Sequence, residues 1–240
     1  MKFLFMFLLV VLVSCGDATV DADKQPITTL KQPNCNEIEW VYDTIGLDEL
    51  FFKGWIKEKI EQGQIPHTGT IIECDNITDK VRHLINYKDG KRDGVQKRWY
   101  DNGQLWIEMN YKDGKGNGLM RSWYENGQLL YKAYQKYGKL DGKEKWWYEN
   151  GQLNAENNYK DGKIRGQAKV WHENGKLHNV INYKVGENNG YAYKDGKVKW
   201  WYDNGQLSSE TNYKDGLKVS AKCWDEDGNE IECSELKQRL

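Results

Sequence analysis

The stretch WYENGQL at residues 123–129 decides how this chain folds, because the chain writes it again and again. It is repeated at 147–153, and near copies are WYDNGQL at 99–105, VWHENGKL at 170–177 and WWYDNGQL at 200–207. The glycines of these copies are 24 residues apart, with one interval of 30: Gly103, Gly127, Gly151, Gly175 and Gly205. Self-similarity at a fixed period is typical of repeat proteins, and one unit repeated about six times fills roughly two thirds of the chain.

Each unit contains two turn signals with a strand-like run between them. Asn-Gly between aromatic or β-branched runs is the strongest short-range signal for a β-hairpin. A second phrase, such as KDGKGNG at 112–118, supplies another and wider turn at the other end. The runs between turns have the length of ordinary strands. We therefore predict an all-β fold, an elongated antiparallel meander of repeated β-hairpins.

The alternation of side chains along a strand assigns the two faces of this sheet. A three-residue loop ending at Gly127 places Trp123 opposite Leu129, and the same arithmetic applies in every copy. The Trp–Leu pairs then form a packing stripe on one face. The other face carries the aromatic residues that follow the tryptophans: Tyr100, Tyr124, Tyr148, His172 and Tyr202.

The recurring tyrosines are the candidate binding face. A row of exposed aromatic side chains suits flat contacts with protein or sugar. The alternative is that tyrosines simply favour strands and cover neighbouring backbone. The candidate residues are Tyr100, Tyr124, Tyr148 and Tyr202.

The N-terminus has the features of a bacterial lipoprotein signal. Residues 3–13, FLFMFLLVVLV, are apolar but too few for a membrane-spanning helix. They end at LVSC, which resembles a lipobox, so we expect a signal peptide over 1–14 and a lipid on Cys15. Gly16 in place of aspartate suggests the outer membrane, by resemblance to lipoprotein sorting. An ordinary signal peptide with a chance cysteine is the alternative.

The remaining segments follow from composition. Residues 15–34 are expected to form a flexible tether, 35–78 an N-terminal region (a possible degenerate first repeat), 79–233 the repeat domain and 234–240 a tail. Four further cysteines in an exported chain favour two disulfides. Of the three possible connectivities we favour Cys35–Cys74 and Cys223–Cys233, because each pair lies within one region.

Charge and motif content argue against nucleic-acid binding and catalysis. The chain has 35 basic and 36 acidic residues, whereas a nucleic-acid binder needs a basic face. No serine lies in a G-x-S-x-G elbow, and we expect no enzyme activity and no cofactor. His172 and His178 flank one turn, with Glu173 as the only obvious third ligand, so we expect no metal site.

The pattern Y-K-x-G-K-x-x-G-x(4)-W-Y-x-N-G-Q-L resembles the MORN-repeat variant of bacterial proteins labelled the YwqK family of antitoxins. The resemblance is clear over 79–211 and weaker over 212–233, and PHTGTIIECDN at 66–76 is similar to that family's opening element. It implies elongated antiparallel sheets that bind or scaffold proteins and lipids, and a toxin as the bound partner.

These observations predict a non-enzymatic, lipid-anchored module that binds or scaffolds another protein at the bacterial envelope. The alternative is a cell-wall or carbohydrate-binding module, because KWWYENG at 145–151 resembles choline-binding repeats, whose aromatic residues cage a ligand.

Overall fold

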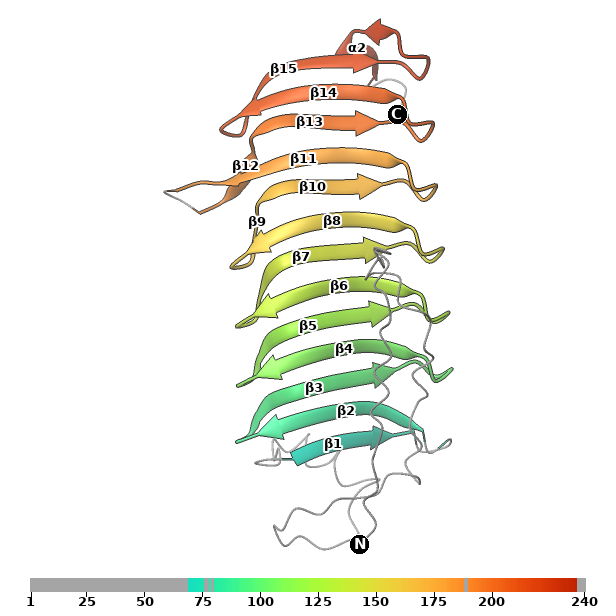
Figure 1. The fold of residues 1–240 in the computed structure, drawn as a ribbon, viewed down its shortest axis with the longest axis vertical. Helices are drawn as coiled ribbons and strands as arrows, with labels where there is room; N and C mark the ends of the chain where they lie inside the picture. Colours follow the sequence, from blue (N-terminus) through green and yellow to red (C-terminus); the bar gives the residue numbers. More distant parts are fainter. Residues whose placement is uncertain (1–68, 76–77, 79, 188–189, 237–240) are drawn as a thin grey trace, which may run out of the picture.

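The computed structural model describes residues 69–75, 78, 80–187 and 190–236. Over these residues the protein is nearly all β, with 16 strands in one open antiparallel meander, so the predicted fold class is confirmed. Figure 1 shows the strands stacked in chain order along the long axis of the molecule, with turns along two opposite edges.

The strands pair with their neighbours in sequence, except that the short strands β9 and β12 pair beside the main path, with β8 and β11. The elements are β1 (Gly69–Cys74), β2 (Val81–Lys88), β3 (Lys91–Trp99), β4 (Leu105–Lys112), β5 (Lys115–Trp123), β6 (Leu129–Lys136), β7 (Lys139–Trp147), β8 (Leu153–Lys160), β9 (Lys163–Ile164), β10 (Gly166–Trp171), β11 (Leu177–Val185), β12 (Ala192–Lys194), β13 (Gly196–Trp201), β14 (Leu207–Lys214), β15 (Leu217–Trp224), β16 (Glu230–Ile231) and α2 (Cys233–Leu236).

The Asn-Gly turns have the predicted length. In the turn that joins β5 to β6, Gly127 N–H donates to Tyr124 C=O over 2.9 Å and Tyr124 N–H donates to Gln128 C=O over 2.8 Å. Gly127 has a φ of 87°, a conformation that glycine adopts without steric cost. Trp123 therefore pairs with Leu129, as the three-residue loop predicts.

The Asp-Gly turns are tighter than the predicted wide turn. Asp113 and Gly114 have φ values of 49° and 79°, and the flanking Lys112 and Lys115 pair directly. Two positive φ values in a two-residue loop match the twist of antiparallel strands, so the turn closes with two residues. The extra length lies in the following strand, β5, where residues 117–119 lie opposite Asn110 between the pairs Tyr111–Gly116 and Met109–Met120. The expected wide turn is thus a tight turn followed by a β-bulge.

The longer interval between the fourth and fifth copies is an extension at the Asp-Gly edge. β11 runs to Val185 and pairs with β12, which begins at Ala192. Between them Gly186 N–H donates to Tyr191 C=O over 2.9 Å. Figure 1 shows this hairpin projecting beyond the other turns. The insertion therefore leaves the body of the sheet unchanged.

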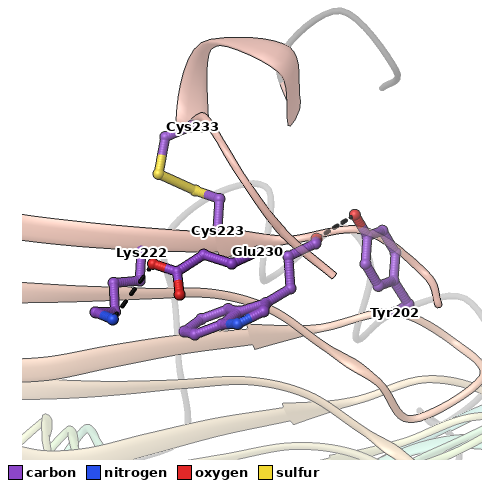
Figure 2. Close-up of a disulfide and its surroundings, with 6 residues drawn as sticks. Tyr202, Lys222, Cys223, Glu230 and Cys233 are labelled. Carbon is purple, nitrogen blue, oxygen red and sulfur yellow. Dashed lines mark hydrogen bonds and ion pairs between the residues drawn. A yellow bond between two sulfur atoms is a disulfide. The ribbon is translucent and has the colours of Figure 1, made fainter. Parts of the chain in front are cut away.

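A disulfide secures the C-terminal end of the sheet. Cys223 on β15 is joined to Cys233 at the start of α2, with 5.1 Å between their Cα atoms (Figure 2). The strand after β15 is short, and only Cys223 and Trp224 pair with it. Cys223–Cys233 is one of the two favoured pairings. Cys74 is also disulfide-bonded. Cys35 and Cys15 lie outside the described residues, so the Cys35–Cys74 disulfide and the lipid on Cys15 stay predictions.

Candidate binding face

The two faces of the sheet carry different side chains. We name them the tryptophan face, which bears Trp99, Trp123, Trp147, Trp171 and Trp201 with their paired leucines, and the tyrosine face opposite. All five Trp–Leu pairs lie in register as predicted: Trp99–Leu105, Trp123–Leu129, Trp147–Leu153, Trp171–Leu177 and Trp201–Leu207. Trp99 and Trp147 are buried, and Leu105 is among the most buried side chains described. The tryptophan face therefore supplies much of the apolar core.

The recurring tyrosines join each unit to the next. The Tyr124 hydroxyl donates to Trp147 C=O over 2.9 Å, and that carbonyl lies 23 residues further along the chain. The other bonds of this series are Tyr100 to Trp123, Tyr148 to Trp171 and Tyr202 to Trp224, with His172 Nε2 on Trp201 C=O in the fourth unit. Burial raises the pKa of the Tyr100 and Tyr124 phenols. We name this series the tyrosine ladder.

The turn asparagines form a second ladder beside the first. Asn102 Nδ2 donates to Glu125 C=O over 3.0 Å, and its Oδ1 accepts from Gln104 N–H. The same pair of contacts recurs at Asn126, Asn150, Asn174 and Asn204. The tyrosine and the asparagine of the repeated signature thus both bond through their side chains to the following unit.

These contacts correct the expectation that the tyrosines form an exposed row. Tyr100, Tyr124, Tyr148 and Tyr202 are half-buried, and each hydroxyl is engaged with backbone. A buried carbonyl needs a donor, and the neighbouring tyrosine is the donor that the sheet provides. The accessible aromatic rings of the tyrosine face are instead Trp106 and Trp146, which are 40% and 39% exposed.

Sequence reasoning missed a polar cluster at the centre of the tyrosine face. Glu144 is only 7% exposed and accepts from Tyr131 OH over 3.0 Å and from Asn157 Nδ2 over 2.8 Å. The Tyr131 ring packs against the Trp146 ring with 4.3 Å between centroids. Burial and the nearby Glu144 raise the pKa of the Tyr131 phenol. Glu144 lies between two lysines in sequence, and the alternation of side chains is the signal that would have placed it inward.

The two histidines that flank the fourth Asn-Gly turn lie close together. The His172 and His178 rings lie 4.4 Å apart, and His178 meets the Trp200 ring edge-on at 5.3 Å. Burial, and then the charge of His172, lowers the pKa of His178. Among the residues that the structure describes, no group of three or more His, Cys, Asp or Glu side chains is placed to hold a metal ion.

Acidic and basic side chains on the tryptophan face neutralise one another. Glu108 lies 2.6 Å from Arg121 and 3.3 Å from Lys97, and it receives these cations from the two neighbouring strands. Burial opposes ionisation of Glu108, but the two cations outweigh it and lower its pKa. Glu156 and Glu210 each pair in the same way with two lysines. The tryptophan face therefore offers few uncompensated charges to a partner.

The comparisons with known proteins identify the repeat. Five segments match the family model described as MORN repeat variant: 92–113, 117–137, 140–161, 165–184 and 194–215. No curated protein matches the chain. Within the described part of the chain, no helix is long and apolar enough to cross a membrane. Repeats of this type generally serve as protein- or membrane-binding modules and not as catalytic domains. Residues 92–215 are therefore a tandem array of MORN repeat variant units.

Proposed function

We propose that the protein is a non-enzymatic module that binds another protein at the bacterial envelope, where a lipid on Cys15 holds it. The supporting observation is that residues on the tyrosine face differ from unit to unit, whereas the turns and the Trp–Leu pairs repeat. The positions equivalent to Arg98 are Ser122, Trp146, Val170 and Trp200, and those equivalent to Ile107 are Tyr131, Ala155, Asn179 and Ser209. Of these residues Arg98 and Trp146 are exposed, whereas Ser122, Tyr131, Asn179 and Ser209 are buried. The side chains that a partner can reach on the tyrosine face therefore differ from one unit to the next.

The distribution of exposed aromatic rings favours a protein over a glycan. A polymer of identical sugars is best matched by aromatic rings that recur at the same place in each unit. Trp106 and Trp146 occupy different places in their units, because the residue equivalent to Trp106 in the third unit is Asn154. Trp146 recurs only as Trp200, with Val170 between them, so these rings form no regular row. Tryptophans in an irregular surface are typical centres of protein–protein binding energy.

The resemblance to YwqK family antitoxins adds a partner class. It implies a toxin as the bound protein, and the signal-like N-terminus would bring the two together at the envelope, with the outer membrane suggested by Gly16. If Cys15 carries the lipid, Cys15→Ala releases the protein from membranes. Unchanged membrane association and unchanged mass would contradict the anchor.

Crosslinking the full-length protein in its own cells tests the proposal. Trp146→Ser introduces the residue that the preceding unit carries at this position, so it keeps the frame of the array. We expect the variant to recover at least tenfold less of the crosslinked protein partner than the unaltered chain. Lys169→Ala, on the tryptophan face, is the control and should recover as much as the unaltered chain.

The alternative function is tested with the same proteins. Retention on purified peptidoglycan by the unaltered chain, lost in Trp146→Ser, would favour a cell-wall binding module. Full recovery of the protein partner by a folded Trp146→Ser variant would remove the tyrosine face from the proposal.

A further inference from the structure

A pocket lies on the tyrosine face where the array begins. It has a volume of about 110 Å³ and is formed by β2, β3 and β4. An engineered cavity of roughly 150 Å³ holds one benzene molecule. The pocket therefore has room for one side chain and not for a nucleotide or a disaccharide. Its lining residues are Ile85, Arg92, Gln96, Lys97, Arg98, Trp106, Ile107 and Met109.

The floor of the pocket holds a hydrogen-bond donor without a partner. Gln96 is 8% exposed, and its Nε2 makes no hydrogen bond. A buried donor left unsatisfied costs about 1–3 kcal/mol, so native structures rarely keep one without a reason. Gln96 pairs across the sheet with Met109, which places its side chain on the same face as the apolar wall. The pocket thus offers an amide donor to a ligand that carries an acceptor.

Two arginines give the pocket a positive charge. The Arg92 guanidinium lies 5.6 Å from the Tyr111 ring centroid, and the groups that act on its charge are the neutral phenols of Tyr87 and Tyr111. Arg98 is exposed at the mouth, and Glu73 on β1 lies near it: a hydrogen bond with His83, and further the charge of Arg98, lower the pKa of the Glu73 carboxyl. None of the lining residues is acidic. Lys97 is turned away, because its ammonium pairs with Glu108 on the tryptophan face.

The opposite wall is apolar. Ile85, Ile107 and Met109 line it, and Trp106 stands at the rim with 40% of its surface exposed. A carboxylate can hydrogen-bond to the amide and the guanidinium groups, and guanidinium binds carboxylate in two-point geometry. An apolar side chain next to that carboxylate would cover Trp106 and the isoleucines.

The combination is confined to the first unit of the array. The positions equivalent to Gln96 are Met120, Glu144, Ala168 and Val198, and none of the positions equivalent to Arg98 is basic. In the third unit the equivalent carboxylate, Glu144, already accepts from Tyr131 and Asn157. The groups that could bind an anion are therefore found together in the first unit and not in the other units.

We propose that this pocket binds an aspartate or glutamate side chain of the protein partner, in a segment that carries an apolar side chain beside the acid. This inference rests on the proposed function, because it names the chemistry of the partner that the tyrosine face binds. The occupant follows from charge complementarity and from the size of the cavity.

The probe is a pair of short peptides, acetyl-Glu-Trp-Glu-Leu-amide and its glutamine counterpart acetyl-Gln-Trp-Gln-Leu-amide. Binding is followed through the methyl NMR signals of Ile85, Ile107 and Met109 in the full-length protein. The test variant combines Gln96→Met with Arg98→Ser, which are the residues of the second unit at these positions, so the frame of the sheet is kept. Lys169→Ala removes a cation from the other face and serves as the matched control.

We expect the glutamate peptide to bind the unaltered protein at least tenfold more tightly than the glutamine peptide does. The double variant should lose this preference, and Lys169→Ala should keep it. Equal binding of the two peptides, or an undiminished preference in the double variant, would overturn the assignment of the pocket. A failure to capture any partner protein in cells overturns the proposed function instead, so the two failures are distinguishable.

Discussion

Tyr124 shows what the repeated signature does at the scale of single residues. Its ring lies beside the turn of its own unit, and its hydroxyl reaches the backbone of the next unit. Asn126 bonds in both directions, to Gln128 N–H within its turn and to Glu149 C=O in the following turn. A residue that hydrogen-bonds to backbone groups both in its own turn and in the neighbouring turn cannot be replaced without loss of these bonds. The recurrence of these letters therefore follows from hydrogen-bonding needs within the array.

Tyr124→Phe should lower the free energy of unfolding by about 1 kcal/mol, because the partly buried Trp147 carbonyl loses its donor. Chemical denaturation measures the loss. Tyr134→Phe is the control, since Tyr134 is 48% exposed and is not part of the ladder. Equal losses for the two variants would show that the ladder bond contributes nothing.

His178 should make the stability of the protein depend on pH. Its folded-state pKa lies below its usual value of 6.5, so the unfolded chain binds a proton more readily than the folded protein does. Stability should therefore be complete above the unfolded pKa, fall as the pH drops through it, and level off below the folded pKa. Urea midpoints between pH 7.5 and 5 measure this fall.

The matched variant is His178→Asn, because the preceding unit carries Asn154 at that position. It should flatten the pH dependence in this range, whereas His67, His83 and His172 remain in both proteins. Carboxylates with lowered pKa, such as Glu210, act only at more acidic pH. An identical slope in the variant and in the unaltered chain would contradict the assignment.

At the scale of the hairpin, turn chemistry made the sheet predictable. Asn-Gly at a fixed distance from Trp and Leu determined the register, and alternation then determined the faces. Which side chains beyond the Trp–Leu pairs reach each face was not predictable in this way. A second register shift follows each Trp–Leu pair, as between Arg98 and Trp99, and it turns Trp106 toward the tyrosine face, where its ring meets Tyr100 at 5.7 Å. No residue type in the local sequence indicates that register shift.

The extension between β11 and β12 should be dispensable. Replacing residues 185–193 with Asp-Gly-Lys restores the NYKDGK phrase and the 24-residue interval. Connections at the rim of a sheet tolerate changes in length, so the free energy of unfolding should change by less than about 1 kcal/mol. Denaturation and circular dichroism measure the outcome. Loss of the cooperative transition would show that the extension contributes to the body of the sheet.

At the scale of the whole molecule, the main contacts among the described strands are between strands that lie close together in the sheet, as in other repeat arrays. The sequence predicted this arrangement because the period is visible in the letters. It did not predict the pocket, because Gln96 and Arg98 lie at positions that differ from unit to unit. They come together with Met109 only when β3 pairs with β4. Positions that vary between units carry no periodic signal, so their grouping appears only in three dimensions.

The C-terminal disulfide should act locally. Cys233→Ser releases a ten-residue closure, for which chain entropy predicts roughly 2–3 kcal/mol. In an array with neighbour-only contacts, this loss should appear as faster amide hydrogen exchange in β15 and β16, with β3 to β8 unchanged. Exchange that increases uniformly along the array would mean that the sheet unfolds as one cooperative body.

The identical joints between successive turns have a genetic consequence. Tyr100, Tyr124 and Tyr148 each meet the same backbone group of the following unit, so one unit fits after any other. One 24-residue unit is encoded by 72 nucleotides. Unequal recombination that copies or deletes such a stretch therefore produces a protein in which every contact between successive turns is of a kind already present. The number of units can change over generations without loss of folding. Residues at the tyrosine-face positions can be substituted independently in each unit. The positions that join one unit to the next and the positions that vary on the tyrosine face are therefore different positions of the same unit.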